Sequence, residues 1–110
     1  MPKSVKHPPP ADTADWWVYM LECSGGRIYT GIAVDVAARY AKHCSGRGAA
    51  FTRINKPLRI IAAMPCADRS SATKSEIALK KLRRPAKLRW AQQWRWHEPP
   101  GAAWPGSVSS

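Results

Sequence analysis

Residues 17–32 have the sequence WVYMLECSGGRIYTGI, which contains two short runs of apolar, β-branched and aromatic residues. The runs cover residues 17–23 and 27–32, and their composition is typical of β-strands. The Ser-Gly-Gly sequence between them favours a tight turn. This stretch therefore predicts an antiparallel hairpin, with Tyr19 on one strand and Tyr29 on the other.

The residues after the hairpin predict a helix, a loop and a third strand. Asp35 is a good N-cap for a helix over residues 36–44, because its carboxylate can accept hydrogen bonds from the free amides of the first turn. Residues 45–57 are rich in Gly, Arg and Lys, so we expect a loop there. The apolar run at residues 58–64 predicts a central or well-covered strand.

Two more helices are predicted at residues 71–82 and 85–96. Apolar residues at helical spacing mark the faces that would be buried. These expected core contacts are Ile77, Leu79, Leu82, Leu88, Ala91 and Trp94. The order of elements is strand, strand, helix, strand, helix, helix, which predicts an α+β fold.

The length of 110 residues suits one compact domain. Residues 1–15 contain four prolines and hardly a large apolar side chain, and residues 97–110 are rich in proline, glycine and serine. Neither segment can bury enough apolar surface to offset the entropy of ordering. We expect disordered tails over 1–15 and 97–110 and a folded domain over 16–96.

The chain is strongly basic, with 18 Lys and Arg against 7 Asp and Glu and a formal net charge of +11. Such a charge attracts polyanions, nucleic acid first and an anionic membrane surface second. The membrane alternative would use residues 85–96 as a basic amphipathic helix.

We expect no membrane partner, because no apolar run approaches the roughly 20 residues that cross a bilayer. The polar, proline-broken N-terminus does not fit a secretory signal. The three cysteines form no C-x-x-C pair, which favours reduced thiols over a zinc site. These features together predict a cytoplasmic protein.

Five residues could supply the chemistry of phosphodiester hydrolysis: Tyr19, Tyr29, Arg39, His43 and Glu76. Arg39 can bind a phosphate with two hydrogen bonds, and Glu76 can offer a carboxylate to Mg²⁺. His43, one helical turn after Arg39, titrates near neutral pH and can accept or relay a proton. Either tyrosine could act as a base if nearby positive charge or a metal lowered its pKa from about 10.

Each of the five also has a structural interpretation. A tyrosine in a strand commonly packs in the core with its hydroxyl in water. Arg39 could be a solvated helix residue, and His43 a cation that suits the helix C-terminus. Glu76 and Lys80 have the spacing of a surface ion pair on a helix. Only their joint order and spacing favour a site.

In that order and spacing the sequence resembles the GIY-YIG nuclease superfamily. The resemblance rests on the Val18-Tyr19-Met20 and Tyr29-Thr30-Gly31 tripeptides, and on six later positions or strings. These are Asp35, Arg39, His43, Phe51-Thr52-Arg53, Pro57-Leu58-Arg59 and the string SEIALKKL at 75–82. It covers about residues 17–95 and is similar to the small stand-alone bacterial members of the superfamily.

The resemblance implies a three-stranded antiparallel sheet flanked by helices. It also implies an endonuclease that cuts phosphodiester bonds with one divalent ion, Mg²⁺ or another such as Mn²⁺. By similarity, Tyr19 would be the general base and Tyr29 would orient water or phosphate. Arg39 would bind the scissile phosphate, His43 would assist the base, and Glu76 would bind the metal.

The expected partner is nucleic acid, with DNA favoured and structured or branched DNA as a candidate substrate. No obligate protein partner is evident. Two clusters of cations would bind phosphates: Arg47, Arg53, Lys56 and Arg59, then Lys80, Lys81, Arg83, Arg84 and Lys87. The alternative is a non-catalytic or weakly catalytic nucleic-acid-binding module with the same fold.

Overall fold

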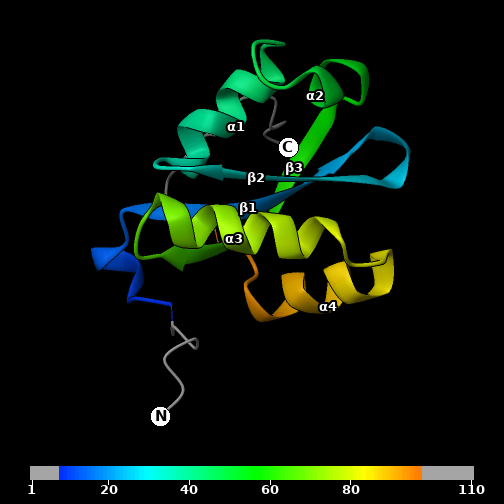
Figure 1. The fold of residues 1–110 in the computed structure, drawn as a ribbon. Coiled ribbons are helices and arrows are strands. Elements are labelled where there is room, and N and C mark those ends of the chain that lie inside the picture. The colour runs from blue at the N-terminus through cyan, green and yellow to red at the C-terminus, as the bar shows by residue number, and fades with distance from the viewer. Residues whose placement is uncertain (1–7, 98–110) are drawn as a thin grey trace.

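A computed structural model describes residues 8–97 (Figure 1). Its strands are β1 (Trp16–Cys23), β2 (Arg27–Ala33) and β3 (Pro57–Cys66). Its α-helices are α1 (Val36–Cys44), α2 (Ala50–Ile54), α3 (Arg69–Lys80) and α4 (Arg84–Gln93). Short 3₁₀ helices cover Ala11–Thr13 (η1) and Ser24–Gly26 (η2). The α+β fold class is confirmed.

The three strands form one antiparallel sheet in the order β2-β1-β3. In the predicted hairpin, Tyr19 pairs with Gly31 and Leu21 pairs with Tyr29. The turn between these strands is the single 3₁₀ turn η2, in which Gly25 and Gly26 have φ of 73° and 75°. Those left-handed angles explain why two glycines occur there.

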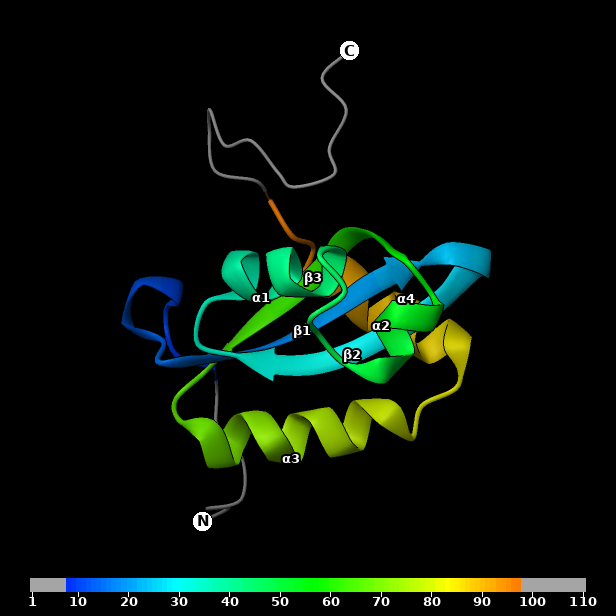
Figure 2. The same cartoon turned by 90° about the horizontal axis from the view of Figure 1, so that it is seen from above.

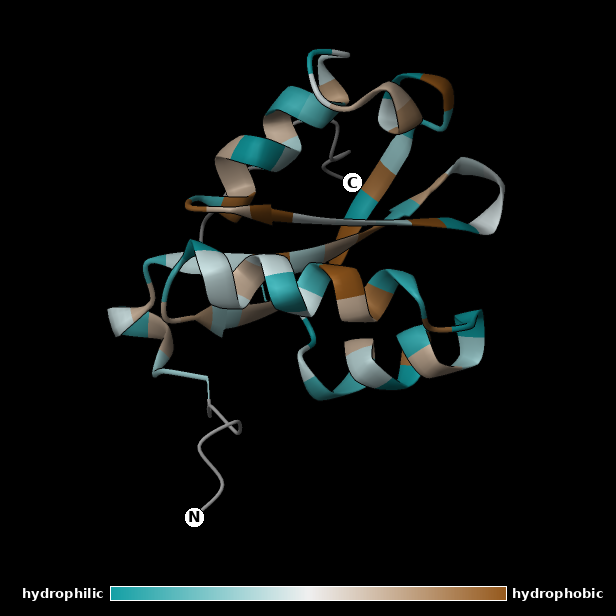
Figure 3. Cartoon of the chain, in the orientation of Figure 1, coloured by the Kyte–Doolittle hydropathy of each residue, from teal (hydrophilic) through white to brown (hydrophobic). Residues whose placement is uncertain are grey.

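Helices cover both faces of the sheet (Figure 1): α1 and α2 lie on one side, and α3 and α4 lie on the other. Seen from above, α3 runs alongside the β2 edge (Figure 2). Figure 3 shows that α1, α3 and α4 each carry hydrophilic as well as hydrophobic residues, as helices with one face on a sheet do.

Each face of the sheet has its own apolar cluster, because side chains alternate along β1. Tyr19 and Leu21 pack with α1 residues such as Tyr40, whereas Val18 and Met20 pack with α3 and α4. The hairpin strand that carries Tyr19 is therefore buried on both sides, which holds its side chains in place.

Side-chain N-caps, the predicted Asp35 among them, explain where two helices begin. Asp35 Oδ1 accepts a hydrogen bond from the amide of Ala38 at 3.0 Å. Asp68 does the same for Ser71 at 2.8 Å, so α3 begins at Arg69, two residues before the predicted start. It ends at Lys80, and Leu82, at 38% exposure, lies beyond it.

The structure corrects the predicted helix faces. Leu79 and Ala91 are buried as expected. Ile77 is 51% exposed and Leu88 is 38% exposed, because the face of each helix that meets the sheet is narrower than its apolar stripe.

The predicted loop over residues 45–57 contains the short helix α2. Five residues without a side-chain cap give little local signal for such a helix. The third strand, predicted to be central or well covered, is not central, since β3 lies at the edge of the sheet, but residues 94–96 cover that edge.

The last predicted helix ends early, and the residues that follow it cover the β3 edge. α4 stops at Gln93, and the following residues pair with β3. The amide of Ala63 donates to the Trp94 carbonyl at 2.9 Å, and the amide of Trp96 donates to Ile61 at 3.0 Å. These bonds satisfy edge groups that a continued helix would have left open.

Residues 1–7 and 98–110 of the two predicted tails lie outside the described residues. Within the first predicted tail, residues 11–13 form η1, which has no buried residue. No helix within residues 8–97 is long and apolar enough to cross a membrane. Cys23, Cys44 and Cys66 form no disulfide with one another.

Candidate active site

A series of hydrogen bonds joins residues of β1, α1 and α2 on the face of the sheet that α1 covers. The hydroxyl of Tyr19 lies 2.8 Å from Nε2 of His43. The other ring nitrogen of His43, Nδ1, lies 2.8 Å from the hydroxyl of Thr52. Thr52 in turn donates to the carbonyl of Ala49 at 2.9 Å. Tyr19, His43 and Thr52 are each 98% or more buried.

Tyr29 completes an aromatic group around His43. Its ring packs edge-on against the imidazole with centroids 4.9 Å apart, and the Tyr19 and Tyr29 centroids are 6.3 Å apart. Tyr29 is only partly buried, unlike Tyr19. The two tyrosines predicted for the site therefore differ in their access to solvent.

Gly31 makes room for both tyrosines. A Cβ at this position would lie 2.7 Å from the Tyr19 hydroxyl oxygen and 2.9 Å from Cε2 of Tyr29. Real side chains do not approach that closely. Gly31 is therefore required by the close approach of the tyrosine rings to the β2 backbone.

Arg39 of α1 lowers the pKa of both Tyr19 and His43. Burial raises the pKa of Tyr19 above its ordinary value and Tyr29 raises it further, while a hydrogen bond from the Arg39 side chain and its charge lower it. Burial lowers the pKa of His43 to about 4, and the positive charge of Arg39 lowers it further. Both groups are therefore neutral at pH 7.

Glu76 reaches this site from α3, on the other side of the sheet. Its negative charge adds to the effects that raise the pKa of Tyr19. It also forms the ion pair with Lys80 expected from their spacing, at 3.2 Å, and its side chain is 20% exposed. The helix that carries it, α3, runs along the β2 edge (Figure 2).

The structure thus brings the other four predicted site residues within contact or electrostatic range of Tyr19. The five residues come from four elements, β1, β2, α1 and α3. Three of them, Tyr29, Arg39 and Glu76, keep part of their surface exposed.

The donor atoms here fit one kind of metal site. No group of three or more His, Cys, Asp or Glu side chains that could hold a metal occurs within residues 8–97. His43 has both ring nitrogens engaged. The partly exposed carboxylate of Glu76 is left, which fits a hydrated Mg²⁺ that takes its other ligands from water and substrate. It does not fit the four-ligand cage of structural zinc.

The predicted phosphate-binding cations are spread over several elements, and all but the half-buried Lys87 are exposed. Three of them also have partners within the chain. Arg59 Nε donates to Glu22 at 2.7 Å, Lys80 pairs with Glu76, and Arg84 Nη1 donates to the Gly26 carbonyl of the hairpin turn. Arg84 therefore has a structural contact as well as a positive charge.

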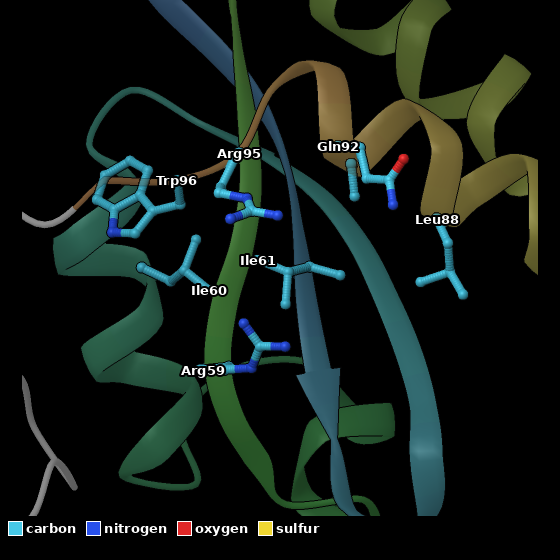
Figure 4. Close-up of a pocket in the computed structure, with 8 residues that line it drawn as sticks. Arg59, Ile60, Ile61, Leu88, Gln92, Arg95 and Trp96 are labelled. Atoms are coloured by element: carbon cyan, nitrogen blue, oxygen red, sulfur yellow. The ribbon is translucent and has the colours of Figure 1, made fainter.

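Arg59 also lines a groove of about 480 Å³ between β3 and the end of α4. Ile60 and Ile61 contribute its apolar lining, together with Leu88 of α4. Figure 4 shows the guanidinium groups of Arg59 and Arg95 on either side of Ile61. The groove borders β3, whereas Gly31 and Tyr29 lie on β2 at the opposite edge of the sheet.

Thr52 was not predicted as a site residue. It belongs to the Phe51-Thr52-Arg53 string that supports the family resemblance, but its contact with His43 requires α2 to fold back onto α1. Gly48 permits that contact, because a Cβ there would lie 2.2 Å from Nδ1 of His43. The only sequence signal was a polar residue in an expected loop.

Comparison with known proteins agrees with this architecture. The sequence model of the GIY-YIG catalytic domain matches residues 15–89. A UPF0213 protein of Cupriavidus pinatubonensis is 49% identical over 67 residues, which are 61% of this chain and 74% of that protein. A UPF0213 protein of Xanthomonas axonopodis pv. citri is 44% identical over 77 residues, 70% of this chain and 76% of that protein.

Among solved structures, the solution NMR structure of a UPF0213 protein from Bacillus halodurans is 37% identical in sequence. The match covers 71% of this chain and 83% of that chain, with a TM-score of 0.46. The sequence match to the catalytic-domain family spans both tyrosine motifs, Arg39, His43 and Glu76. The chain therefore belongs to the GIY-YIG family.

Proposed function

We propose that this protein is a metal-dependent endonuclease that hydrolyses phosphodiester bonds in DNA. The observation that carries the proposal is the set of groups that act on the Tyr19 phenol. His43 is hydrogen-bonded to it, and the charges of Arg39 and Glu76 both affect its pKa. Hydrolysis of a phosphodiester needs a cation on the phosphate, a proton acceptor for water and a charge that offsets the pentavalent transition state. This group of residues can supply the first two from the protein alone.

In this proposal the exposed members of the site bind the DNA first. The Arg39 guanidinium holds two oxygens of the scissile phosphate, and Tyr29 lies beside it at the rim. Glu76 and phosphate oxygens would hold Mg²⁺, which when bound neutralises phosphate charge and orients the attacking water. Tyr29 lies on β2, and α3, which carries Glu76, runs alongside it, so in this proposal the substrate passes along the β2 edge.

Tyr19 serves as the proton relay behind the phosphate. Its raised pKa keeps it a neutral phenol at pH 7, so it does not act as a free phenolate. Instead its oxygen accepts a proton from the attacking water while its own proton passes to His43 Nε2, 2.8 Å away. The neutral imidazole of His43 is the base required for this transfer.

The test is cleavage of end-labelled duplex, flap and four-way-junction DNA with Mg²⁺. We compare wild type with Arg39→Ala and Glu76→Gln, which remove the phosphate contact and the metal ligand. Lys42→Ala, on the same helix as Arg39 but exposed, controls for the loss of one positive charge. We expect cutting by wild type and Lys42→Ala, and a loss of at least about 100-fold in the two site variants.

The same samples separate the alternative function. DNA binding is measured by fluorescence anisotropy without Mg²⁺. If wild type binds DNA and cuts no DNA or RNA with Mg²⁺ or Mn²⁺, the nuclease proposal is wrong and a binding module is supported. If Arg39→Ala cuts as fast as Lys42→Ala, the assignment of the site is wrong.

A further inference from the structure

The hydrogen-bond chain through His43 has a direction that its two ends determine. At one end, the Ala49 carbonyl can only accept a hydrogen bond. At the other end, the Arg39 guanidinium beside the Tyr19 hydroxyl can only donate. Between these ends, each hydroxyl and the neutral imidazole have one proton to donate.

From the Ala49 end, the positions of the protons follow one by one. The Thr52 hydroxyl gives its proton to Ala49 at 2.9 Å, so toward His43 it can only accept. Nδ1 of His43, 2.8 Å from that oxygen, must then carry the proton of the imidazole. Nε2 is left with its lone pair toward Tyr19, 2.8 Å away.

From the Arg39 end, the same direction results. Tyr19 has His43 Nε2 as the acceptor for its hydroxyl proton. If Nε2 carried the proton instead, the buried Tyr19 hydroxyl would face two donors, Arg39 and His43. A buried hydroxyl proton without an acceptor is unfavourable.

We propose that Thr52 is a positioning residue that holds His43 in the tautomer protonated on Nδ1, so that Nε2 is free to receive the proton of Tyr19. Gly48 supports this arrangement, because any side chain there would collide with Nδ1. The role of this tautomer in catalysis rests on the proposed function. The tautomer itself is a property of the folded protein and can be measured without a substrate.

The relay that this tautomer permits is balanced. As the oxygen of water bonds to phosphorus, its O–H bond breaks and the proton passes to the Tyr19 oxygen. The phenolic proton passes to Nε2, and His43 becomes an imidazolium whose Nδ1–H stays bonded to Thr52. The bond from phosphorus to the leaving oxygen breaks with its electron pair on that oxygen, which lies opposite the attacking water and takes a proton from solvent. His43 returns its extra proton to solvent through Tyr19, which restores the starting state.

The experiment uses the full chain labelled with ¹⁵N at histidine. Proton–nitrogen NMR correlations distinguish a protonated from an unprotonated ring nitrogen, and His43→Gln identifies the His43 signals. We compare wild type, Thr52→Val, which keeps the shape and loses the hydroxyl, and Thr52→Ser, which keeps the hydroxyl. We expect Nδ1–H in wild type and Thr52→Ser, and a shift toward Nε2–H in Thr52→Val.

Thr30→Val is the matched control. Thr30 is also a buried threonine of the domain, at 3% exposure, and its hydroxyl has no hydrogen-bond partner among residues 8–97. It faces away from Tyr29 and Gly31, since side chains alternate along β2. Its substitution should leave the His43 tautomer unchanged.

A cleavage assay then tests the consequence. We expect Thr52→Val to lower kcat about 10- to 100-fold with KM little changed, and Thr52→Ser to restore most of the rate. An Nε2–H signal in wild type, or an unchanged tautomer in Thr52→Val, would overturn the inference. The wild-type spectrum decides the tautomer even if Thr52→Val fails to fold.

The two proposals can fail separately. If the spectra are as expected and no nucleic acid is cut, the nuclease function is wrong while the positioning of His43 by Thr52 stands. If DNA is cut and the tautomer does not depend on Thr52, the function stands and this inference is wrong.

Discussion

The hydroxyl of Tyr19 lies 2.8 Å from Nε2 of His43, and both side chains are at most 1% exposed. Removing the hydroxyl in Tyr19→Phe leaves a buried nitrogen without its donor. We expect a loss of about 1–3 kcal/mol in the free energy of unfolding, measured by urea denaturation at pH 7.

Tyr29→Phe is the comparison for that measurement. It removes the Tyr29 hydroxyl and keeps the edge-on contact of the ring with His43. Because Tyr29 is only partly buried, we expect its loss of stability to be less than half that of Tyr19→Phe. Equal losses would show that the hydrogen bond to His43 contributes nothing specific.

The low pKa of His43 makes stability depend on pH. Its pKa is lowered from 6.5 to about 4 in the folded protein, so between these values the unfolded chain binds more protons. Stability should therefore fall as pH is lowered from about 6.5 to 4, and this contribution should level off below 4. The loss from this residue is on the order of 3 kcal/mol.

His43→Gln provides the reference, because glutamine does not titrate. The groups facing His43 from other positions are Tyr19, Tyr29 and Arg39, and His43→Gln leaves all three in place. The difference between the wild-type and variant stability curves thus isolates His43. Parallel curves over this range would contradict the prediction.

Gly31→Ala should disturb both tyrosines. The new methyl group would lie 2.7 Å from the Tyr19 hydroxyl, so the rings must move. We expect a loss of about 1–3 kcal/mol in stability together with a loss of DNA cleavage.

Gly46→Ala is a control with a different kind of strain. Gly46 has φ of 82°, and among residues 8–97, its two chain neighbours aside, no atom would lie within 4 Å of a Cβ at this position. The cost should be about 1 kcal/mol from the backbone alone, and cleavage should be retained. If Gly46→Ala abolishes cleavage as fully as Gly31→Ala, crowding of the tyrosines is not the cause.

Removal of divalent metal should affect activity and not folding. Glu76 is the one carboxylate that we assign to the metal, and the fold gives it an ion pair with Lys80 as well. We expect EDTA to abolish cleavage while leaving the thermal unfolding midpoint unchanged within error. A large drop in the midpoint on adding EDTA would indicate a structural metal that this proposal does not contain.

Two neighbouring arginines should have different roles. Arg84 donates to the Gly26 carbonyl, so Arg84→Ala should lower stability by up to about 1 kcal/mol. Arg83, exposed at the start of α4, should leave stability unchanged when replaced by Ala. Arg83→Ala should instead weaken DNA binding and reduce the salt dependence of log K by about 1. Equal stability losses in the two variants would contradict this division.

Local features of the fold were predictable because their causes lie close together in the sequence. The Ser-Gly-Gly turn joins two strands of high β-propensity, and the caps at Asp35 and Asp68 start helices through contacts three residues away. Helix α2 and the pairing of residues 94–96 with β3 were missed. No sequence pattern over a few residues predicts either of them. Both form contacts with residues of other elements, α2 with α1 and residues 94–96 with β3.

The sequence alone determined the hairpin, the helix that carries Arg39 and His43, and the strong positive charge, since propensity, capping and composition act over a few residues. Only the tertiary structure decided that Thr52 meets His43 and that the charge of Glu76 acts on Tyr19. Those contacts join residues from different elements. They depend on how helices pack on a twisted sheet, which a local pattern does not specify.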